Sequence, residues 1–264
     1  VAALSPSDWA EGQRRGAQII DGRAEQVLFS LDRRAPHQPD LYRWQPTGGP
    51  ARVAEVNPGG VLSWRVDGAG TPRLRQSYRI GPEQPVYRWE WRQEAYGAWT
   101  PLAQWQLDQP AWRPLRFATD DALWVAAETS QRDTHALHRI SLLAGALSAP
   151  EVASRGADLT NVWWSSQQRQ PALVEWSSLL PHQRALLPQW QQWQQQLRAL
   201  DPGAHWLFRQ MDEASAQGLV TRLDGQRPQS WWRFQPNAQP KAVELGSEWP
   251  QPRAAVAPLR VLRW

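Results

Sequence analysis

The stretch LRFATDDALWVAAETSQRDTHALHRISLLAGALSAPEV, residues 115–152, decides the fold class because it contains one complete series of short strands and turns. Ala122–Ala127 is a short apolar run with the composition of a buried strand. Ala136–Leu142 alternates between two faces, as a half-buried strand does, and a polar loop is expected over Thr129–Thr134. Gly145 is expected to turn the chain into a further strand. We therefore predict a four-stranded antiparallel unit.

A four-residue landmark within this unit recurs along the chain. It consists of an apolar residue, an aromatic residue or His, an Arg and a second apolar residue. The copies are LYRW at 41–44, VYRW at 86–89, LHRI at 137–140 and WWRF at 231–234. Repeats of roughly 40 to 50 residues, each with several strands, are typical of β-propeller blades.

The arginines of the landmarks give the period. Arg43 and Arg88 are 45 residues apart, Arg88 and Arg139 are 51 apart, and Arg139 and Arg233 are 94 apart, which is two intervals of 47. The missing copy would fall near residue 186, and ALVEW at 172–176 is the nearest candidate, displaced by a helical insertion behind it. Chance recurrence, in a chain with 28 Arg and 19 Trp, is the alternative.

The whole chain is predicted to be one all-β domain. We expect residues 1–264 to form a β-propeller of four-stranded antiparallel blades, about five or six of them visible, although residues 1–24 show no clear pattern. Its 23 Pro and 17 Gly are scattered, which fits many short strands joined by turns.

One segment breaks the β pattern. A helical insertion is expected at 185–200, because apolar residues are spaced 4, 3, 4 and 3 apart and Gln occupies the opposite face. These apolar residues are Leu186, Trp190, Trp193, Leu197 and Leu200. We expect this helix to pack on its own blade; the alternative is a docking helix for a partner domain.

Composition excludes several classes of protein. The net charge is only +4 and acidic residues are interspersed among the arginines, which argues against a nucleic-acid partner. No run approaches 18 apolar residues, so no membrane span is predicted. The chain has no Cys, which excludes disulfides and thiolate metal sites but leaves the compartment open.

The sequence nominates no catalytic, cofactor-binding or metal-binding residue. It lacks the GxSxG spacing of an α/β-hydrolase nucleophile and any phosphate-binding glycine loop. None of the five histidines, His37, His135, His138, His182 and His205, has the setting of a general base. His135 and His138 would lie on opposite faces of a strand, without further ligands beside them.

The acidic and aromatic residues fit structural roles. The carboxylates at Asp32, Asp120–Asp121 and Asp67 lie at turn signals, where they ordinarily accept hydrogen bonds from their own backbone. The 19 Trp could stack on sugars, but they are spread over nearly every predicted strand, which favours packing.

Several pieces, in order, resemble the propeller domain of bacterial prolyl oligopeptidase family serine peptidases of the acylaminoacyl peptidase and dipeptidyl peptidase type. The resemblance covers about residues 25–264. Its pieces are VLFSLDRRAPHQPDLYRW at 27–44, VAEVNPGGVLSWRVDGAGTPRLR at 53–75, WTPLAQW at 99–105, SQRDTHALHRISLLAGAL at 130–147, the helix after ALVEW, and APLRVLRW at 257–264.

The resemblance implies about seven blades and a separate α/β-hydrolase domain that holds the Ser, Asp and His triad. Residues 256–264 would be the link toward that domain, which is absent from this chain. The implied function is a noncatalytic lid that restricts access to short peptides, with the hydrolase domain or chain and a peptide substrate as partners. The chain alone would then hydrolyse nothing, while its parent would be a serine peptidase. The alternatives are a free-standing propeller that binds a protein or peptide and, third, a sugar-binding propeller.

Overall fold

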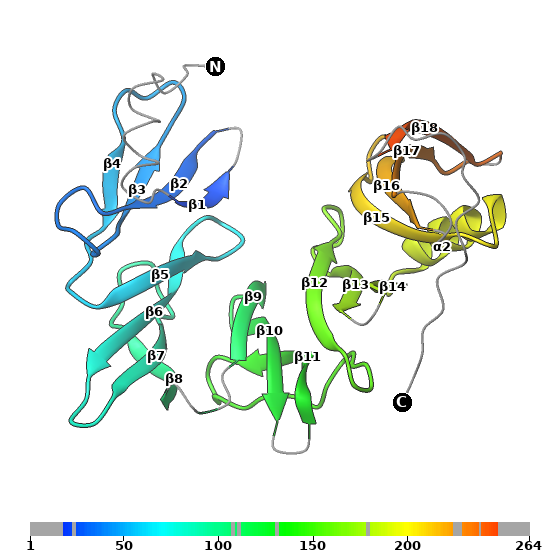
Figure 1. Cartoon of the computed structure of the whole chain (residues 1–264). Helices are drawn as coiled ribbons and strands as arrows, with labels where there is room; N and C mark the ends of the chain where they lie inside the picture. The colour runs from blue at the N-terminus through cyan, green and yellow to red at the C-terminus, as the bar shows by residue number, and fades with distance from the viewer. Residues whose placement is uncertain are drawn as a thin grey trace. The chain divides into compact units, whose positions relative to one another are not determined.

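The computed structural model describes residues 18–22, 25–106, 109, 112–129, 132–177, 180–223, 229–237 and 239–247, which fold into five antiparallel sheets and one helix (Figure 1). The prediction of an all-β chain with one helical insertion is confirmed. Residues 1–17 and the expected link at 256–264 lie outside the described ranges. No described helix has the length and hydropathy of a membrane span.

Each sheet is a meander, in which strands adjacent in sequence are adjacent in space. The first sheet contains β1 (Gln18–Gly22), β2 (Val27–Leu31), β3 (Asp40–Trp44) and β4 (Arg52–Glu55). The second contains β5 (Val61–Val66), β6 (Pro72–Ile80), β7 (Pro85–Trp91) and β8 (Thr100–Gln106). The third contains β9 (Trp112–Thr119), β10 (Ala122–Thr129) and β11 (Arg132–Ser141).

The remaining sheets follow the same order. The fourth contains β12 (Asp158–Trp164), β13 (Pro171–Ser177) and β14 (His182–Ala185). The fifth contains β15 (His205–Asp212), β16 (Gln217–Leu223), β17 (Ser230–Gln235) and β18 (Lys241–Ser247). All five sheets are therefore blade-like, with three or four strands each.

The stretch that decided the fold class folds nearly as predicted. Beyond β11 the chain returns along the third sheet, but only two isolated bridges, Leu137 with Val152 and Ile140 with Leu147, take the place of the expected fourth strand. Pro150 lacks a backbone N–H, which prevents a continuous ladder here. The expected loop over Thr129–Thr134 is wrong in extent, because β10 includes Thr129 and β11 begins at Arg132.

The four landmarks all lie on the third strand of their sheets, β3, β7, β11 and β17. The fourth sheet follows the same rule, because its third strand, β14, carries Arg184. The arginine spacings then become 45, 51, 45 and 49 residues from Arg43 to Arg233. The choice of ALVEW as the displaced landmark was wrong: that segment is the second strand of its sheet, and the true copy, HQRA at 182–185, lacks the aromatic residue.

The chain divides into two compact units. The first, residues 1–133 with 137–152, contains the first two sheets and nearly all of the third; the second, residues 134–136 with 153–264, contains the last two sheets and the helix. In the first unit, one apolar cluster joins the first and second sheets, and another joins the second and third. The single domain over residues 1–264 stays a prediction.

The helix of the second unit, α2 (Pro188–Leu200), packs on its own sheets, as expected. Trp190, Trp193 and Leu197 are buried in one cluster with side chains of the fourth and fifth sheets. The helix begins two residues later than Leu186 because the residue before a proline avoids the α conformation. Leu187 is accordingly extended, and Leu186 donates its N–H to the Ala172 carbonyl at 2.8 Å.

Candidate functional site

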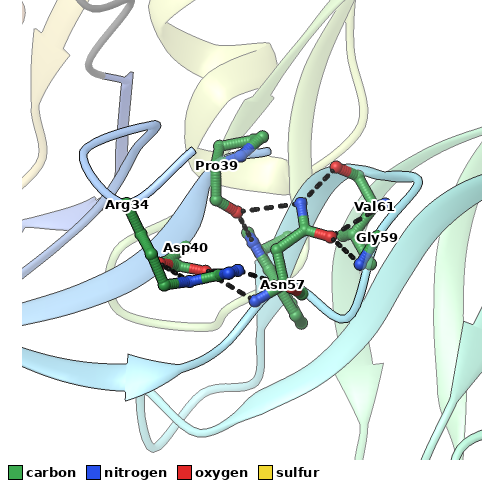
Figure 2. A network of polar contacts seen from close by, with 7 residues as sticks. Arg34, Pro39, Asp40, Asn57, Gly59 and Val61 are labelled. Atoms are coloured by element: carbon green, nitrogen blue, oxygen red, sulfur yellow. Dashed lines mark hydrogen bonds and ion pairs between the residues drawn. The ribbon is translucent and has the colours of Figure 1, made fainter. Parts of the chain in front are cut away.

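The polar groups buried between successive sheets are the most elaborate constellations in the described part of the chain. The first, here called the Asn57 joint, lies where β4 passes to β5 (Figure 2). Its local sequence is NPGG, and Gly59 and Gly60 have φ of 110° and 76°, which only glycine adopts readily. A Cβ on Gly60 would lie 2.5 Å from the Tyr78 carbonyl oxygen, so this turn depends on glycine.

Asn57 uses its backbone and its side chain to fix this turn. Its N–H donates to Asp40 Oδ1 at 2.7 Å, and its Nδ2 donates to the Val61 carbonyl at 2.7 Å. Its Oδ1 accepts hydrogen bonds from the N–H groups of Gly59 at 2.9 Å and Val61 at 3.2 Å. Figure 2 shows these contacts converging on Asn57, which ties the start of β3 to the start of β5.

Arg34 completes the Asn57 joint. Its guanidinium contacts both oxygens of the buried Asp40 carboxylate at 3.1 Å and donates to the Asn57 carbonyl at 2.7 Å. Asp40, by hydrogen bonding and by its charge, raises the pKa of Arg34. A buried carboxylate with a bidentate partner and a backbone donor is a fixed structural anchor, since its lone pairs are already occupied.

Two buried arginines form a second joint in the first unit. Arg92 forms an ion pair with Glu55 of β4 and donates to the Pro72 carbonyl at 2.8 Å. Arg73 donates to the carbonyl oxygens of Arg92 and, at 3.0 Å, of Asp120. These contacts connect the first sheet to the second and the second to the third.

The joint of the second unit is centred on Glu213, in the turn after β15. Its Oε2 accepts hydrogen bonds from Ser165 Oγ, from the backbone and hydroxyl of Ser166, and from the Gln167 N–H, at 2.7 to 3.2 Å. Its Oε1 accepts from Trp190 Nε1 at 2.7 Å. Burial by itself would raise the pKa of Glu213, but these donors outweigh burial and lower it.

The hydrogen bonds and ion pairs of these joints stabilise the packing of neighbouring sheets and are poorly suited to catalysis. The Ser165 and Ser166 hydroxyls donate straight to a carboxylate with a lowered pKa, which is a weak base for activating a nucleophile. Among the described residues there is no group of three or more His, Cys, Asp or Glu side chains placed to hold a metal ion.

The residues weighed in the sequence have ordinary partners. His135 contacts Asp158 at 3.2 Å, and its N–H and ring lower the pKa of that carboxyl. His138 is buried, with Nδ1 3.0 Å from the Ser148 carbonyl oxygen. The expected backbone hydrogen bonds are present at two of these turns: Asp67 accepts from two backbone N–H groups and Asp32 from that of His37. Asp121 instead accepts from the Thr119 hydroxyl.

Packing accounts for many of the tryptophans, as expected. Within the described ranges the buried ones are Trp64, Trp89, Trp91, Trp176, Trp190, Trp193 and Trp206. Trp231, by contrast, is 36% exposed.

Sequence reasoning missed Arg92 and Glu213 and took Asn57 only as a turn residue. For Glu213 and for Arg73 one signal exists in the sequence, because their distant partners lie about one repeat away; Arg92 has no such signal, since its partner Glu55 is 37 residues away. Ser165 and Glu213 are separated by 48 residues, and Arg73 and Asp120 by 47. A short sequence motif does not show which residues about one repeat apart will be in contact.

Comparisons with known proteins give distant likenesses only. No family model and no curated protein matches the chain. An uncharacterized protein from Listeria monocytogenes EGD-e is 8% identical with a TM-score of 0.39, over 86% of this chain and 64% of that one. A structure from a structural and mechanistic analysis of two prolyl endopeptidases is 17% identical with a TM-score of 0.41, over 90% of this chain and 37% of that one.

The chain thus spans less than two thirds of either structure. Similarities with TM-scores this low support no conclusion about the fold or the function of this chain. The blade-like character of the sheets therefore depends on their own strand order and register: five consecutive antiparallel meanders, with an arginine repeated on each third strand.

Proposed function

We propose that this chain is the noncatalytic propeller part of a prolyl oligopeptidase-like serine peptidase, in which it acts as a lid that limits access of peptides to a hydrolase domain. The observation that carries the proposal is the series of five blade-like sheets at a period of 45 to 51 residues, with the sequence pieces that resemble this family placed in order along them. The hydrolase domain or chain and a peptide substrate are the proposed partners.

The joints support a rigid role. A lid selects by size only if its walls keep their spacing, and the Asn57 joint, the arginine pair and the Glu213 joint fix neighbouring sheets through buried, well-satisfied hydrogen bonds. Under this proposal the chain supplies no reacting group, and the chemistry belongs to its partner.

The test compares substrates of two sizes. The purified 264-residue chain should release no product from chromogenic tri- and tetrapeptides. In a longer protein that joins it to a GxSxG-bearing segment, deletion of residues 1–264 should raise cleavage of unfolded casein relative to cleavage of a tetrapeptide.

The control is a Ser→Ala variant of the GxSxG serine, which should abolish both activities. Hydrolysis by the isolated chain, or unchanged size selection after the deletion, would contradict the proposal. If the reading frame contains no hydrolase segment, the free-standing peptide- or protein-binding propeller becomes the better assignment.

A further inference from the structure

The last strand of the fifth sheet, β18, lies at the edge of that sheet (Figure 1). It pairs with β17 on one side, and no other described strand pairs with it. All its residues except Ala242 are exposed, and a Cβ added to Gly246 would meet no described heavy atom within 4 Å. The backbone N–H and C=O groups that point away from β17 can therefore accept a further strand.

The strands that end the other sheets are protected against such pairing. β4 and β14 have only four residues each, and the chain after β14 continues into α2. β8 contains Pro101, and the segment that returns along the third sheet contains Pro150. Short edges and prolines prevent one sheet from joining another. β18, with seven residues and no proline, has neither protection.

Apolar side chains border this edge and are only partly covered. Val243 is 48% exposed and Leu245 is 59% exposed. Val243 is opposite Arg233 on β17, so Trp231, two residues before Arg233, lies on the same face of the sheet as Val243. Trp231 is itself 36% exposed. A strand added to β18 would therefore bury apolar surface as well as satisfy backbone groups.

We propose that β18 pairs antiparallel with β18 of a second copy of this chain, so that two fifth sheets become one continuous sheet. Adding a strand to an exposed edge is a common way for two chains to associate, and a twofold axis allows both copies to use the same edge. This inference needs only the fifth sheet and goes beyond the proposed lid function.

The side chains of β18 select one register for this pair. A twofold axis places one residue opposite its own copy, on the same face of the joined sheet. Glu244 at that position would bring two carboxylates together, which is destabilising. Ala242 at that position would leave an overlap of only three residues, Lys241–Val243.

Val243 at the twofold axis avoids both problems. The two valines then pack against each other, and Ala242 of one copy is opposite Glu244 of the other. Lys241 is opposite Leu245 of the other copy, so no residue is directly opposite a like charge. The strand is thus complementary to itself, which is why the second copy is the occupant assigned here. Because one short strand from each copy makes the contact, the dimer belongs to the weak class of interfaces.

The test follows the oligomeric state of the 264-residue chain by analytical ultracentrifugation from about 10 μM to about 1 mM, the range of weak association. The chain should change from monomer to dimer over this range, and hydrogen exchange of β18 should slow as the concentration rises. Val243→Lys removes the valine pair and places two ammonium groups opposite each other, so it should weaken the dimer at least about tenfold.

Val53→Lys is the matched control, because Val53 is 50% exposed on β4, the last strand of the first sheet, and the variant makes the same change in size and charge. It should leave dimerisation unchanged. Neither variant should lower the melting temperature of the monomer by more than a few degrees, since both residues are half exposed.

A second pair of variants tests the register without adding charge. The chain has no Cys, so Val243→Cys introduces a single thiol opposite its own copy. Under mild oxidation this variant should form a disulfide-linked dimer faster than Glu244→Cys. A chain that stays monomeric up to about 1 mM, equal weakening in Val243→Lys and Val53→Lys, or faster crosslinking of Glu244→Cys would overturn the proposal.

Discussion

The two compact units join their sheets with opposite kinds of charge. In the first unit, guanidinium groups of Arg34, Arg73 and Arg92 donate to backbone carbonyls and carboxylates of neighbouring sheets. In the second unit, one carboxylate, Glu213, accepts from neutral hydroxyl, amide and indole donors. The first unit thus relies mainly on charged donors, with Asp40 as the buried acceptor of the Asn57 joint, whereas the second relies on one carboxylate with neutral donors. The two units should therefore respond differently to mutation and acid.

The largest effect is expected from Trp190→Ala in the second unit. Trp190 is buried in the core and also donates to Glu213, so the variant opens a cavity and leaves Glu213 Oε1 without its partner. We expect a loss of about 3–5 kcal/mol in the free energy of unfolding. Urea unfolding, with hydrogen exchange of β15 and β16 as the local probe, checks it.

Trp231→Ala is the control for this prediction, because Trp231 is 36% exposed and should cost far less. Equal losses in the two variants would show that α2 contributes little to the stability of its unit.

The next effect is expected from Asn57→Ala in the first unit. The variant removes both side-chain donors and the acceptor of Gly59 and Val61, leaving polar groups of a buried turn unpaired. A loss of about 2–4 kcal/mol follows if two such groups remain unsatisfied. Hydrogen exchange should show opening of β3 and β5 but not of β15 and β16.

Asn237→Ala makes the same chemical change at an exposed residue whose side chain accepts one hydrogen bond, from the Gln239 N–H, and should cost under about 1 kcal/mol. An Asn57→Ala protein as stable as this control would mean that the glycines alone fix the turn.

A smaller but more selective effect is expected from acid. Glu213, Asp158 and Asp212 have lowered pKa values, and all three belong to the second unit. For Glu213 the ordinary pKa is 4.5, so its stabilisation is present above that pH and is lost as the pH falls through the lower folded value. The second unit should therefore open first below about pH 4.5.

Hydrogen exchange at pH 7 and pH 3.5, compared between β2–β3 and β15–β16, measures this difference. Glu213→Gln should lower the stability of the second unit at pH 7, because the amide nitrogen of Gln would face N–H and O–H donors. The variant should also reduce the dependence of that stability on pH. Earlier acid opening of the first unit would contradict the comparison.

The sequence predicted what depends on local pattern and missed what depends on distant pairing. The strand periodicity predicted the blade-like sheets and identified the third-strand arginines other than Arg184, and the apolar spacing predicted α2. HQRA was overlooked because Gln183 replaces the aromatic residue: its side chain instead contacts Glu175 and the Phe208 backbone. Glu213 was overlooked because its donors Ser165 and Trp190 come from other elements, and no short motif records that convergence.

The spacing of the joint partners has a consequence for how the chain folds. A contact that spans 46 to 48 residues closes as soon as the next sheet has formed, so no joint has to wait for a distant part of the polypeptide. During synthesis a newly completed sheet can dock on the preceding sheet of its own unit. Assembly of each unit can therefore proceed stepwise from its N-terminal side, because no contact of these joints closes a loop longer than the 48 residues between Ser165 and Glu213.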